Sequence, residues 1–283
     1  MDILHTIDTV RGMLKTLRSE RETIALVPTM GNLHEGHLKL VETAGIAHSC
    51  VVVSIFVNPL QFGPDEDFDS YPRTLDEDCA QLKAAGARVV FAPSVAEMYP
   101  LGQQNHVEVK LPHLANLLCG EHRPGHFDGV GTVVTKLFNI IRPDAAFFGE
   151  KDYQQLQLIR IISEQLNLTT NVLGVPTVRA TDGLALSSRN QYLNESERAS
   201  APLLHATITG IREKIAAGEQ DYAGLQSDAL AQLSKAGFVP DYVEVRDAQT
   251  LSAPTTSTKE LRILAAARLG KARLIDNIGA ETP

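Results

Sequence analysis

Two histidines with a glycine between them, His34 and His37, stand in the segment PTMGNLHEGH at residues 28–37. The segment follows a short apolar run at residues 23–27 and precedes helical spacing of apolar residues at 36–47, so it lies between a strand and a helix. A helix N-terminus has unpaired N–H groups and the positive end of a dipole, which together bind anions. Two imidazoles beside it suit a triphosphate, because its leaving oxygens gain negative charge as a P–O bond breaks.

Two other interpretations of this motif compete with phosphate binding. A zinc peptidase helix needs H-E-x-x-H, whereas this chain has H-E-G-H, so the spacing disfavours metal ligation. A purely structural pair of histidines is the second alternative. The neighbouring Gly31 and Gly36 favour a ligand, because glycine allows the backbone to approach one closely.

A second candidate segment, FFGEKDYQQ at residues 147–155, also follows a short apolar run and opens a helix. Lys151 can place a point charge on a phosphate, and Asp152 is a good N-cap. Gln155, about one helical turn later, could hydrogen-bond a hydroxyl or a carboxylate. Considered alone, residues 149–152 are more typical of an ordinary capped helix start.

A third segment, TDGLALSSRN at residues 181–190, lies where the composition of the chain changes. Ser187, Ser188 and Arg189 offer two hydroxyls and a guanidinium, which suit phosphate oxygens. A loop between two domains can also close over a ligand. The alternative is a solvated linker.

Neutral amides follow the apolar run at residues 51–57, where Asn58 and Gln61 could hold a carboxylate and hydroxyls without adding charge. Arg123 and His126 precede another expected helix and could add a cation and an imidazole to the same site.

Acidic residues are concentrated in one part of the chain. Residues 61–80 contain seven acids and one arginine, a net charge of −6 within a total of −8. The run at residues 65–69 and the later helix start suit a solvated loop and a favourable helix dipole. The alternative is a magnesium site that uses Glu77, Asp78 or Gln81.

The elements that must position these groups alternate between strands and helices over residues 1–176. Such alternation predicts an α/β fold with a doubly wound parallel sheet, whose ligands bind at the carboxyl ends of the strands near a switch in strand order. Strands are expected at 23–27, 51–57, 88–91, 145–148 and 171–175, and helices at 36–47, 73–85, 129–141 and 152–166. Residues 177–283 group their elements instead, with helices at 195–217 and 221–235 and strands at 241–246 and 261–269, which predicts a smaller α+β domain that closes over the site.

Composition agrees with a globular chain of 283 residues, of which 43% are hydrophobic and 21% charged. The acidic balance disfavours a nucleic-acid partner. Three widely spaced cysteines predict reduced thiols and a cytoplasmic location. The uncharged stretch at 43–64 has a short β-branched centre followed by Asn58 and Pro59, so we expect a buried strand rather than a membrane span.

Together these segments resemble the pantothenate synthetase (pantoate–β-alanine ligase) family of the HIGH-motif nucleotidyltransferase superfamily. The resemblance rests on PTMGNLHEGH, VSIFVNPLQF, YPRTLDEDC, RPGHFDGV, FFGEKDYQQL and DGLALSSRN in order, with RLIDN at 273–277 similar to the family's tail. It implies a Rossmann-like fold and an ATP-dependent condensation of pantoate with β-alanine to pantothenate, AMP and pyrophosphate, through pantoyl adenylate. It also implies a cytoplasmic homodimer that uses Mg²⁺.

The resemblance implies a role for each matching position. ATP-binding residues would be Met30, Gly31, Asn32, Leu33, His34, Glu35, Gly36, His37, Gly149, Glu150, Lys151, Asp152, Val178, Leu186, Ser187, Ser188 and Arg189. His37, His34, Lys151 and Arg189 would be the catalytic members of this set. Gln61, Gln155 and Asn58 would bind pantoate or β-alanine, and Asp78, Glu77 and Gln81 would be the magnesium candidates.

Two alternative functions are kept. One is another HIGH-motif nucleotidyltransferase that acts on a phosphomonoester, which would need a further cationic site for the acceptor phosphate. The other is a nucleotide-binding regulator without turnover. An aminoacyl-tRNA synthetase shares the superfamily motifs, but the acidic charge and the lack of room for an anticodon domain disfavour it.

Overall fold

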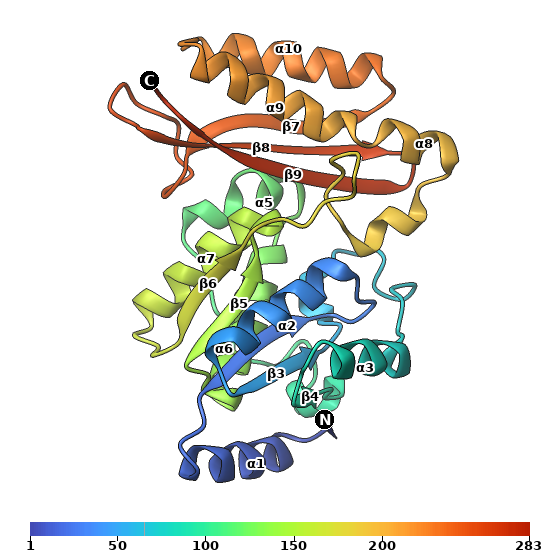
Figure 1. The fold of residues 1–283 in the computed structure, drawn as a ribbon, viewed down its shortest axis with the longest axis vertical. Coiled ribbons are helices and arrows are strands. Elements are labelled where there is room, and N and C mark those ends of the chain that lie inside the picture. The colour runs from blue at the N-terminus through green and yellow to red at the C-terminus, as the bar shows by residue number, and fades with distance from the viewer. Residues whose placement is uncertain (65) are drawn as a thin grey trace. The chain divides into compact units, whose positions relative to one another are not determined.

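The computed structural model describes residues 1–64 and 66–283, which divide into two compact units (Figure 1). The first unit comprises Met1–Glu150 and Gln155–Pro176, and the second comprises Lys151–Gln154 and Thr177–Pro283. The main boundary therefore follows Pro176, where the composition changes. The chain also contributes the short segment Lys151–Gln154 to the second unit.

A parallel sheet of six strands forms the centre of the first unit, in the order β1-β4-β3-β2-β5-β6. The strands are β1 (Asp2–Leu4), β2 (Ile24–Thr29), β3 (Cys50–Ile55), β4 (Val89–Phe91), β5 (Ala145–Gly149) and β6 (Asn171–Val175). β2 pairs with β3 on one side and with β5 on the other, all in parallel. The prediction of a doubly wound α/β sheet is confirmed.

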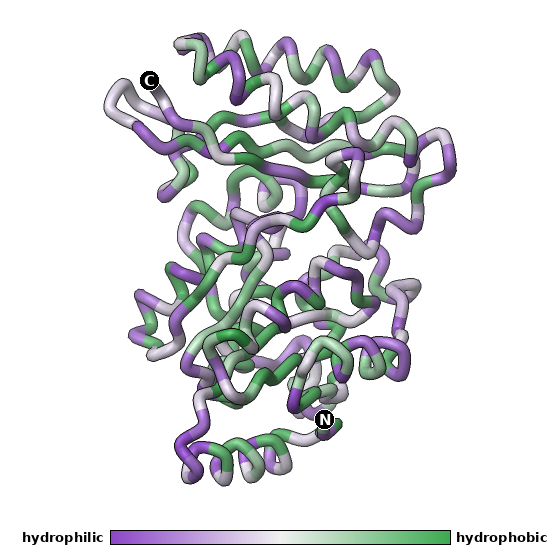
Figure 2. Tube along the Cα trace, viewed as in Figure 1, coloured by the Kyte–Doolittle hydropathy of each residue, from purple (hydrophilic) through white to green (hydrophobic). Residues whose placement is uncertain are grey.

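Helices cover both faces of this sheet because its strands are apolar on both faces. Ile24 and Leu26 of β2 belong to one core, with residues of α1 (Ile7–Ser19), α6 (His126–Ile141) and α7 (Tyr153–Gln165). Ala25 and Val27 belong to the opposite core, with α2 (Glu35–Ala47) and α3 (Leu75–Ala84). Figure 2 shows hydrophilic and hydrophobic residues alternating along α1, as expected of a helix with one face on a core.

Short helical segments make up much of the remaining first unit. They are α4 (Val95–Met98), α5 (Cys119–His122) and the 3₁₀ turns η1 (Pro59–Gln61) and η2 (His113–Asn116), while η3 (Glu150–Asp152) crosses from the first unit into the segment Lys151–Gln154 of the second. The turn η1 directly follows β3 in the chain and packs against α6.

The second unit is the smaller α+β unit that the sequence predicted. Its antiparallel sheet has the order β7-β8-β9, made of β7 (Val239–Asp247), β8 (Glu260–Leu269) and β9 (Ala272–Glu281). Its helices are α8 (Glu195–Ser200), α9 (Leu203–Ala216) and α10 (Tyr222–Lys235), with the turn η4 (Ser188–Tyr192) before them. Apolar residues of α9 and α10 form one core with the three strands.

The structure corrects the predicted elements in two ways, by a break in one expected helix and by elements that the sequence did not predict, among them β1, α1 and β9. The helix expected at 195–217 is two helices, α8 and α9, because Pro202 has no N–H and its ring opposes a continuous helix. The final strand, β9, was not predicted, although it contains the RLIDN motif. The alternation of residues in β9 is weak because Asp276 and Asn277 are polar yet buried.

The uncharged stretch at 43–64 forms the end of α2, the buried strand β3 and the turn η1. In the described part of the chain, no helix is long and apolar enough to span a membrane. Cys50, Cys79 and Cys119 are buried, and within the described residues none of them forms a disulfide.

Candidate functional site

Polar segments follow three neighbouring strands of the first unit. Residues 30–37 follow β2, residues 58–61 follow β3, and Glu150 follows β5. The chain runs outward from β2 to β3 and β4, and later returns to β5 on the other side of β2. The strand order therefore switches between β2 and β5, which is the place where ligands bind in open parallel sheets.

His34 and His37 lie together at the start of α2. Their ring centroids are 4.1 Å apart, and His34 is the N-cap of the helix. Each imidazole accepts a hydrogen bond from a backbone N–H at the start of the helix, so the two residues form a reciprocal cap. The pair is thus built into the helix start that would bind an anion.

Hydrogen bonds assign the tautomers of these two rings. The N–H of Gly36 donates to Nδ1 of His34 at 3.1 Å, and the N–H of His34 donates to Nδ1 of His37 at 3.3 Å. A neutral imidazole that accepts at Nδ1 carries its proton on Nε2. Both rings are therefore set to donate from Nε2.

The loop before the histidines has a left-handed backbone. Gly31 has φ of 81° and Asn32 has φ of 51°. A Cβ on Gly31 would lie 3.0 Å from Oδ2 of Asp78 and 3.2 Å from Ile55, so glycine fits both the conformation and the space. Asp78 accepts hydrogen bonds from the N–H of Asn32 at 2.9 Å and of Leu33 at 2.8 Å.

Asp78 therefore has a role that differs from the magnesium ligand considered from sequence. It is buried, and its Oδ2 also accepts from the hydroxyl of Thr74 at 3.1 Å. Glu77 is exposed and Gln81 is half-buried. Within the described residues, no group of three or more His, Cys, Asp or Glu could hold a metal ion by itself. A magnesium site that uses Asp78, Glu77 or Gln81 together with ATP stays a prediction. Asp65, the first residue of the acidic run, lies outside the described residues.

Gln61 contacts the loop after β2 directly. Its Nε2 donates to the sulfur of Met30 at 3.0 Å, and its Oε1 accepts from Nδ2 of Asn58 at 3.2 Å. The segments after β2 and β3 are thus joined through one amide side chain.

Asn58, predicted from sequence to bind substrate, instead holds the segment after β3. Its Nδ2 also donates to the carbonyl of Gly129 at 3.1 Å. Its Oδ1 accepts from the hydroxyl of Tyr99 at 2.8 Å and from the N–H of Leu60 at 3.4 Å. The amide thus uses both of its donors and both of its acceptor positions within the protein, so a contact from Asn58 to substrate stays a prediction.

Arg123 and His126 fix the backbone of Gln61. His126 Nδ1 bonds to the Gln61 carbonyl at 2.7 Å, while its Nε2 accepts from Arg123 at 2.9 Å, which places the proton on Nδ1. Arg123 also donates to Gln61 O at 3.3 Å and pairs with both carboxylate oxygens of Glu66. Burial opposes ionisation of Glu66, but the hydrogen bonds and charge of Arg123 outweigh it and lower the pKa of this carboxyl. These residues position Gln61 through its main chain.

Gly129 allows α6 to approach this segment. A Cβ at this position would lie 2.2 Å from the carbonyl oxygen of Leu60 and 2.8 Å from the N of Gln61, so any side chain would displace the turn. Because Gly129 has no side chain, its helix lies against the backbone of η1.

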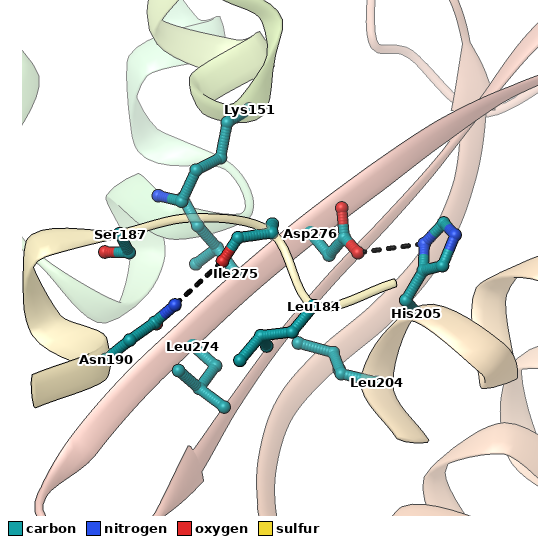
Figure 3. Close-up of a pocket in the computed structure, with 10 residues that line it drawn as sticks. Lys151, Leu184, Ser187, Asn190, Leu204, His205, Leu274, Ile275 and Asp276 are labelled. Atoms are coloured by element: carbon teal, nitrogen blue, oxygen red, sulfur yellow. Dashed lines mark hydrogen bonds and ion pairs between the residues drawn. The ribbon is translucent and has the colours of Figure 1, made fainter. Parts of the chain in front are cut away.

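The second unit brings together the other predicted phosphate-binding residues. The chain forms a small hairpin in which Leu186 N–H donates to the carbonyl of Val178 at 3.0 Å. Ser187 follows at once and caps η4 by accepting from the N–H of Arg189 at 3.3 Å. Lys151 and Ser187 line one cavity of about 10 Å³, enough for roughly one water molecule, with Asn190 and Asp276 (Figure 3).

Comparison with known proteins identifies the family. A family model described as pantoate-beta-alanine ligase matches residues 2–279. The chain belongs to the pantoate-β-alanine ligase family. A pantothenate synthetase from Pseudomonas savastanoi pv. phaseolicola is 52% identical over 278 residues, which is 98% of each chain.

Solved structures of this ligase family agree with the fold. The enzyme from Thermus thermophilus has a TM-score of 0.91 at 44% identity, over 98% of this chain and 99% of that one. The pantoate-β-alanine ligase from Francisella tularensis, complexed with a β,γ-ATP compound and β-alanine, has a TM-score of 0.83 at 33% identity. That match covers 98% of this chain and 97% of the other.

The remaining positions of the ligase motifs are distributed between the units. Glu35 and Gly36 form the first turn of α2, and Gly149 and Glu150 end β5 and begin η3 in the first unit. Gln155 lies half-buried in the first turn of α7. Lys151, which belongs to the second unit, has its Nζ 3.8 Å from Asp152. No hydrogen bond described here joins Gln155 to Gln61, so a shared substrate site for them stays a prediction.

Sequence reasoning missed the positioning role of several ligase residues. The sequence predicts a solvated acid at Glu66 and a solvated or metal-binding acid at Asp78, whereas each accepts hydrogen bonds from a group that shapes the site. No local pattern could reveal this, because Glu66 lies 57 positions from Arg123 and Asp78 lies 46 from Asn32. In the sequence, the only sign of this region was its high proportion of acidic residues.

Proposed function

We propose that the chain condenses pantoate with β-alanine, with ATP as the substrate that activates pantoate. Pantoate and ATP first give pantoyl adenylate and pyrophosphate. β-Alanine then attacks the acyl carbon, so that a C–N bond forms and the acyl–phosphate bond to AMP breaks. Family membership along nearly the whole chain supports this activity.

The observation that carries the proposal is the pair of imidazoles at the start of α2. Their Nδ1 atoms accept from backbone N–H groups, so each ring carries its proton on Nε2, the atom that we propose donates to phosphate oxygens. Fixed donors at a helix N-terminus stabilise charge that develops on the leaving pyrophosphate. His37 and His34 are the catalytic residues that we assign in the first unit.

The first step needs no general base. A carboxylic acid with a pKa of about 4 is ionised near pH 7, so pantoate attacks the α-phosphorus as the carboxylate. What it needs is orientation, which gives a large share of catalytic rate. We propose that Gln61, held by Met30 and by its own backbone contacts, orients pantoate together with Gln155.

Lys151 and Arg189 of the second unit supply positive charge to the phosphates, and Ser187 and Ser188 supply hydroxyls. We propose that Val178 and Leu186 contact the nucleotide beside them. Since an acyl adenylate hydrolyses readily, closure of residues 177–283 over the bound substrates would protect it from water.

Magnesium enters this proposal with ATP, and no step is assigned to a protein-bound ion. The Asp78 carboxylate already binds Asn32 and Leu33, so it has little capacity for a metal. We further propose a cytoplasmic homodimer, as expected from the family resemblance. Light scattering of the purified chain tests the dimer, and cell fractionation tests the location.

Pyrophosphate–ATP exchange tests the function. The protein is incubated with ATP, magnesium and labelled pyrophosphate, with and without pantoate and with other 2-hydroxy acids in its place. Label should enter ATP only with pantoate, and β-alanine should then release AMP. Folded protein that shows no pantoate-dependent exchange would exclude the proposal.

The same experiment distinguishes the alternatives. A nucleotidyltransferase for phosphomonoesters would exchange label with a phosphorylated acceptor rather than pantoate. A regulator without turnover would bind ATP but exchange no label with any acid. Gln61 and Gln155 favour the carboxylate substrate, because neutral amides would not neutralise an acceptor phosphate.

A further inference from the structure

Two adjacent polar residues of β9, Asp276 and Asn277, are unusual because each is only 3% exposed. Burial of a carboxylate and an amide is costly unless hydrogen bonds compensate for the lost water. Successive side chains of a strand point to opposite faces, so these neighbours can reach two different segments of the second unit.

Asn277 holds the segment Lys151–Gln154. Its Nδ2 donates to the carbonyl of Lys151 at 2.8 Å, and its Oδ1 accepts from Nε of Arg262 at 2.6 Å. The guanidinium of Arg262 lies 3.9 Å from the ring centroid of Tyr153, whose hydroxyl donates to Ala248 O at 2.9 Å. The backbone that carries Lys151 is thus fixed at three points.

Asp276 holds the other segment, the hairpin that ends at Ser187. Arg179 donates two hydrogen bonds to its carboxylate, at 2.6 and 2.8 Å, and a third to Gly183 O within the hairpin at 3.1 Å. His205 Nδ1 adds a contact at 3.1 Å, drawn in Figure 3. Burial would raise the pKa of Asp276, but the hydrogen bonds of His205 and Arg179 outweigh it, and the pKa is lowered.

The hairpin transmits this anchor to the phosphate-binding residues. Arg179 pairs with Ala185 across it, and Leu186 bonds to Val178 immediately before Ser187. Asn190 returns to donate to Ala185 O at 3.0 Å, a contact also visible in Figure 3. The register of the hairpin therefore determines where residues 187–189 begin.

We propose that Asp276 and Asn277 are positioning residues that hold Lys151 and residues 187–189 in one fixed arrangement for the phosphates of ATP. The proposal rests on the proposed function of those phosphate-binding segments. It gives the RLIDN motif a purpose that the sequence alone did not supply. Neither residue touches the reacting atoms, and both act through the backbone or through Arg179.

The sharpest variant is Asn277→Asp, which has nearly the same shape. Its carboxylate can still accept from Arg262, but it has no N–H for the Lys151 carbonyl and repels it. ATP binding by calorimetry should weaken about tenfold, and pyrophosphate exchange should fall at least as much, since small displacements are costly in catalysis. Reaction of supplied pantoyl adenylate with β-alanine should stay within about twofold of wild type, because it does not use the β- and γ-phosphates.

Asp241→Asn is the matched control. Asp241 pairs with Arg273 at 2.7 Å in the same sheet and contacts neither phosphate-binding segment in the described hydrogen bonds. Asp241→Asn should leave ATP affinity unchanged, while Asp276→Asn should weaken ATP affinity as Asn277→Asp does. A general disturbance of the sheet would instead slow both half-reactions, pyrophosphate exchange and reaction with β-alanine. It would do so in the control variant as well.

Unchanged ATP affinity and exchange in folded Asn277→Asp would overturn the proposal, as would an equal loss in both half-reactions. If Asn277→Asp does not fold, Tyr153→Phe tests the proposal in its place. It removes only the hydrogen bond to the Ala248 carbonyl, and it should also weaken ATP binding. Wild-type protein that binds ATP but exchanges nothing with pantoate would end the proposed function. The calorimetric comparison would still judge the positioning role.

Discussion

The carboxylate of Asp78 accepts a hydrogen bond from the N–H of Asn32 at 2.9 Å, although the two residues are 46 positions apart. Asn32 has a left-handed backbone, and the loop that contains it leads to the two histidines at the start of α2. An acid that resembled a metal ligand in sequence thus supports the loop that leads to these histidines.

Replacement of Asp78 by Ala should therefore weaken ATP binding at every magnesium concentration. The loop would lose two hydrogen bonds to a charged acceptor, each with a value of about 1.5–3 kcal/mol. We expect the KM for ATP to rise about tenfold and the thermal midpoint to fall. The control is Glu77→Gln on the exposed face of α3, which should change neither value. A magnesium-dependent defect in Glu77→Gln would contradict this assignment.

A second prediction separates the two roles of His34. His34→Asn can keep an acceptor for the N–H of Gly36, because the Asn amide reaches as far as Nδ1, but it has no group at Nε2. Stability should stay within about 0.5 kcal/mol of wild type. Pantoate-dependent exchange should fall about 100-fold, the usual loss of one transition-state donor.

His34→Ala provides the comparison, since it should lose both the cap and the exchange activity. Loss of the cap should lower the free energy of unfolding, measured by urea denaturation, by about 1 kcal/mol. Full exchange activity in His34→Asn would show that Nε2 has no catalytic role.

A third prediction concerns the support of Gln61 by His126. His126→Ala should raise the KM for pantoate about tenfold, because it removes a 2.7 Å bond to the Gln61 backbone, and should leave the KM for ATP nearly unchanged. Steady-state kinetics with each substrate varied in turn measures both constants. His113→Ala, at an exposed histidine, is the control. An equal rise in both constants would indicate a general loss of structure.

Gly129→Ala should be strongly destabilising, since its Cβ would lie 2.2 Å from Leu60 O. We expect a loss of about 3 kcal/mol or more from backbone displacement, with a reduced affinity for pantoate. Gly12→Ala is a matched control in an exposed position of α1, where nothing lies within 4 Å of the new Cβ. It should stabilise the chain by about 0.5–1 kcal/mol. Urea denaturation of the two variants should thus give opposite signs.

The last prediction uses the lowered pKa of Asp276. A carboxyl whose pKa is lower in the folded state stabilises it above its ordinary pKa of about 4, and this stabilisation is lost as pH falls through the folded value. Asp276→Asn should therefore have a lower denaturation midpoint than wild type at pH 7, and the gap should narrow below pH 4. A difference between the two denaturation midpoints that stays constant down to pH 3 would contradict a stabilising role for the ionised Asp276 carboxylate.

The sequence by itself determined the fold class and indicated the segments that we propose carry the chemistry. Alternating apolar runs and helical spacing are local, so they predicted the parallel sheet without any tertiary information. The strand order, which places the switch between β2 and β5, came only from the structure. The motif around His34 and His37 predicted a helix N-terminus, and α2 begins at Glu35. Local signals failed where they conflicted, as at Pro202 and in β9.

Only the tertiary structure decided which polar residues have capacity for a ligand and which are already satisfied. Asn58 matched a substrate-binding residue in sequence. In the structure its amide forms hydrogen bonds with Tyr99 and Gly129, which are distant along the chain. Asp276 and Asn277 were part of an uninterpreted motif until the sheet brought Arg179 and Lys151 to them. Hydrogen-bond partners far apart along the chain depend on packing, and no spacing rule within one segment encodes them.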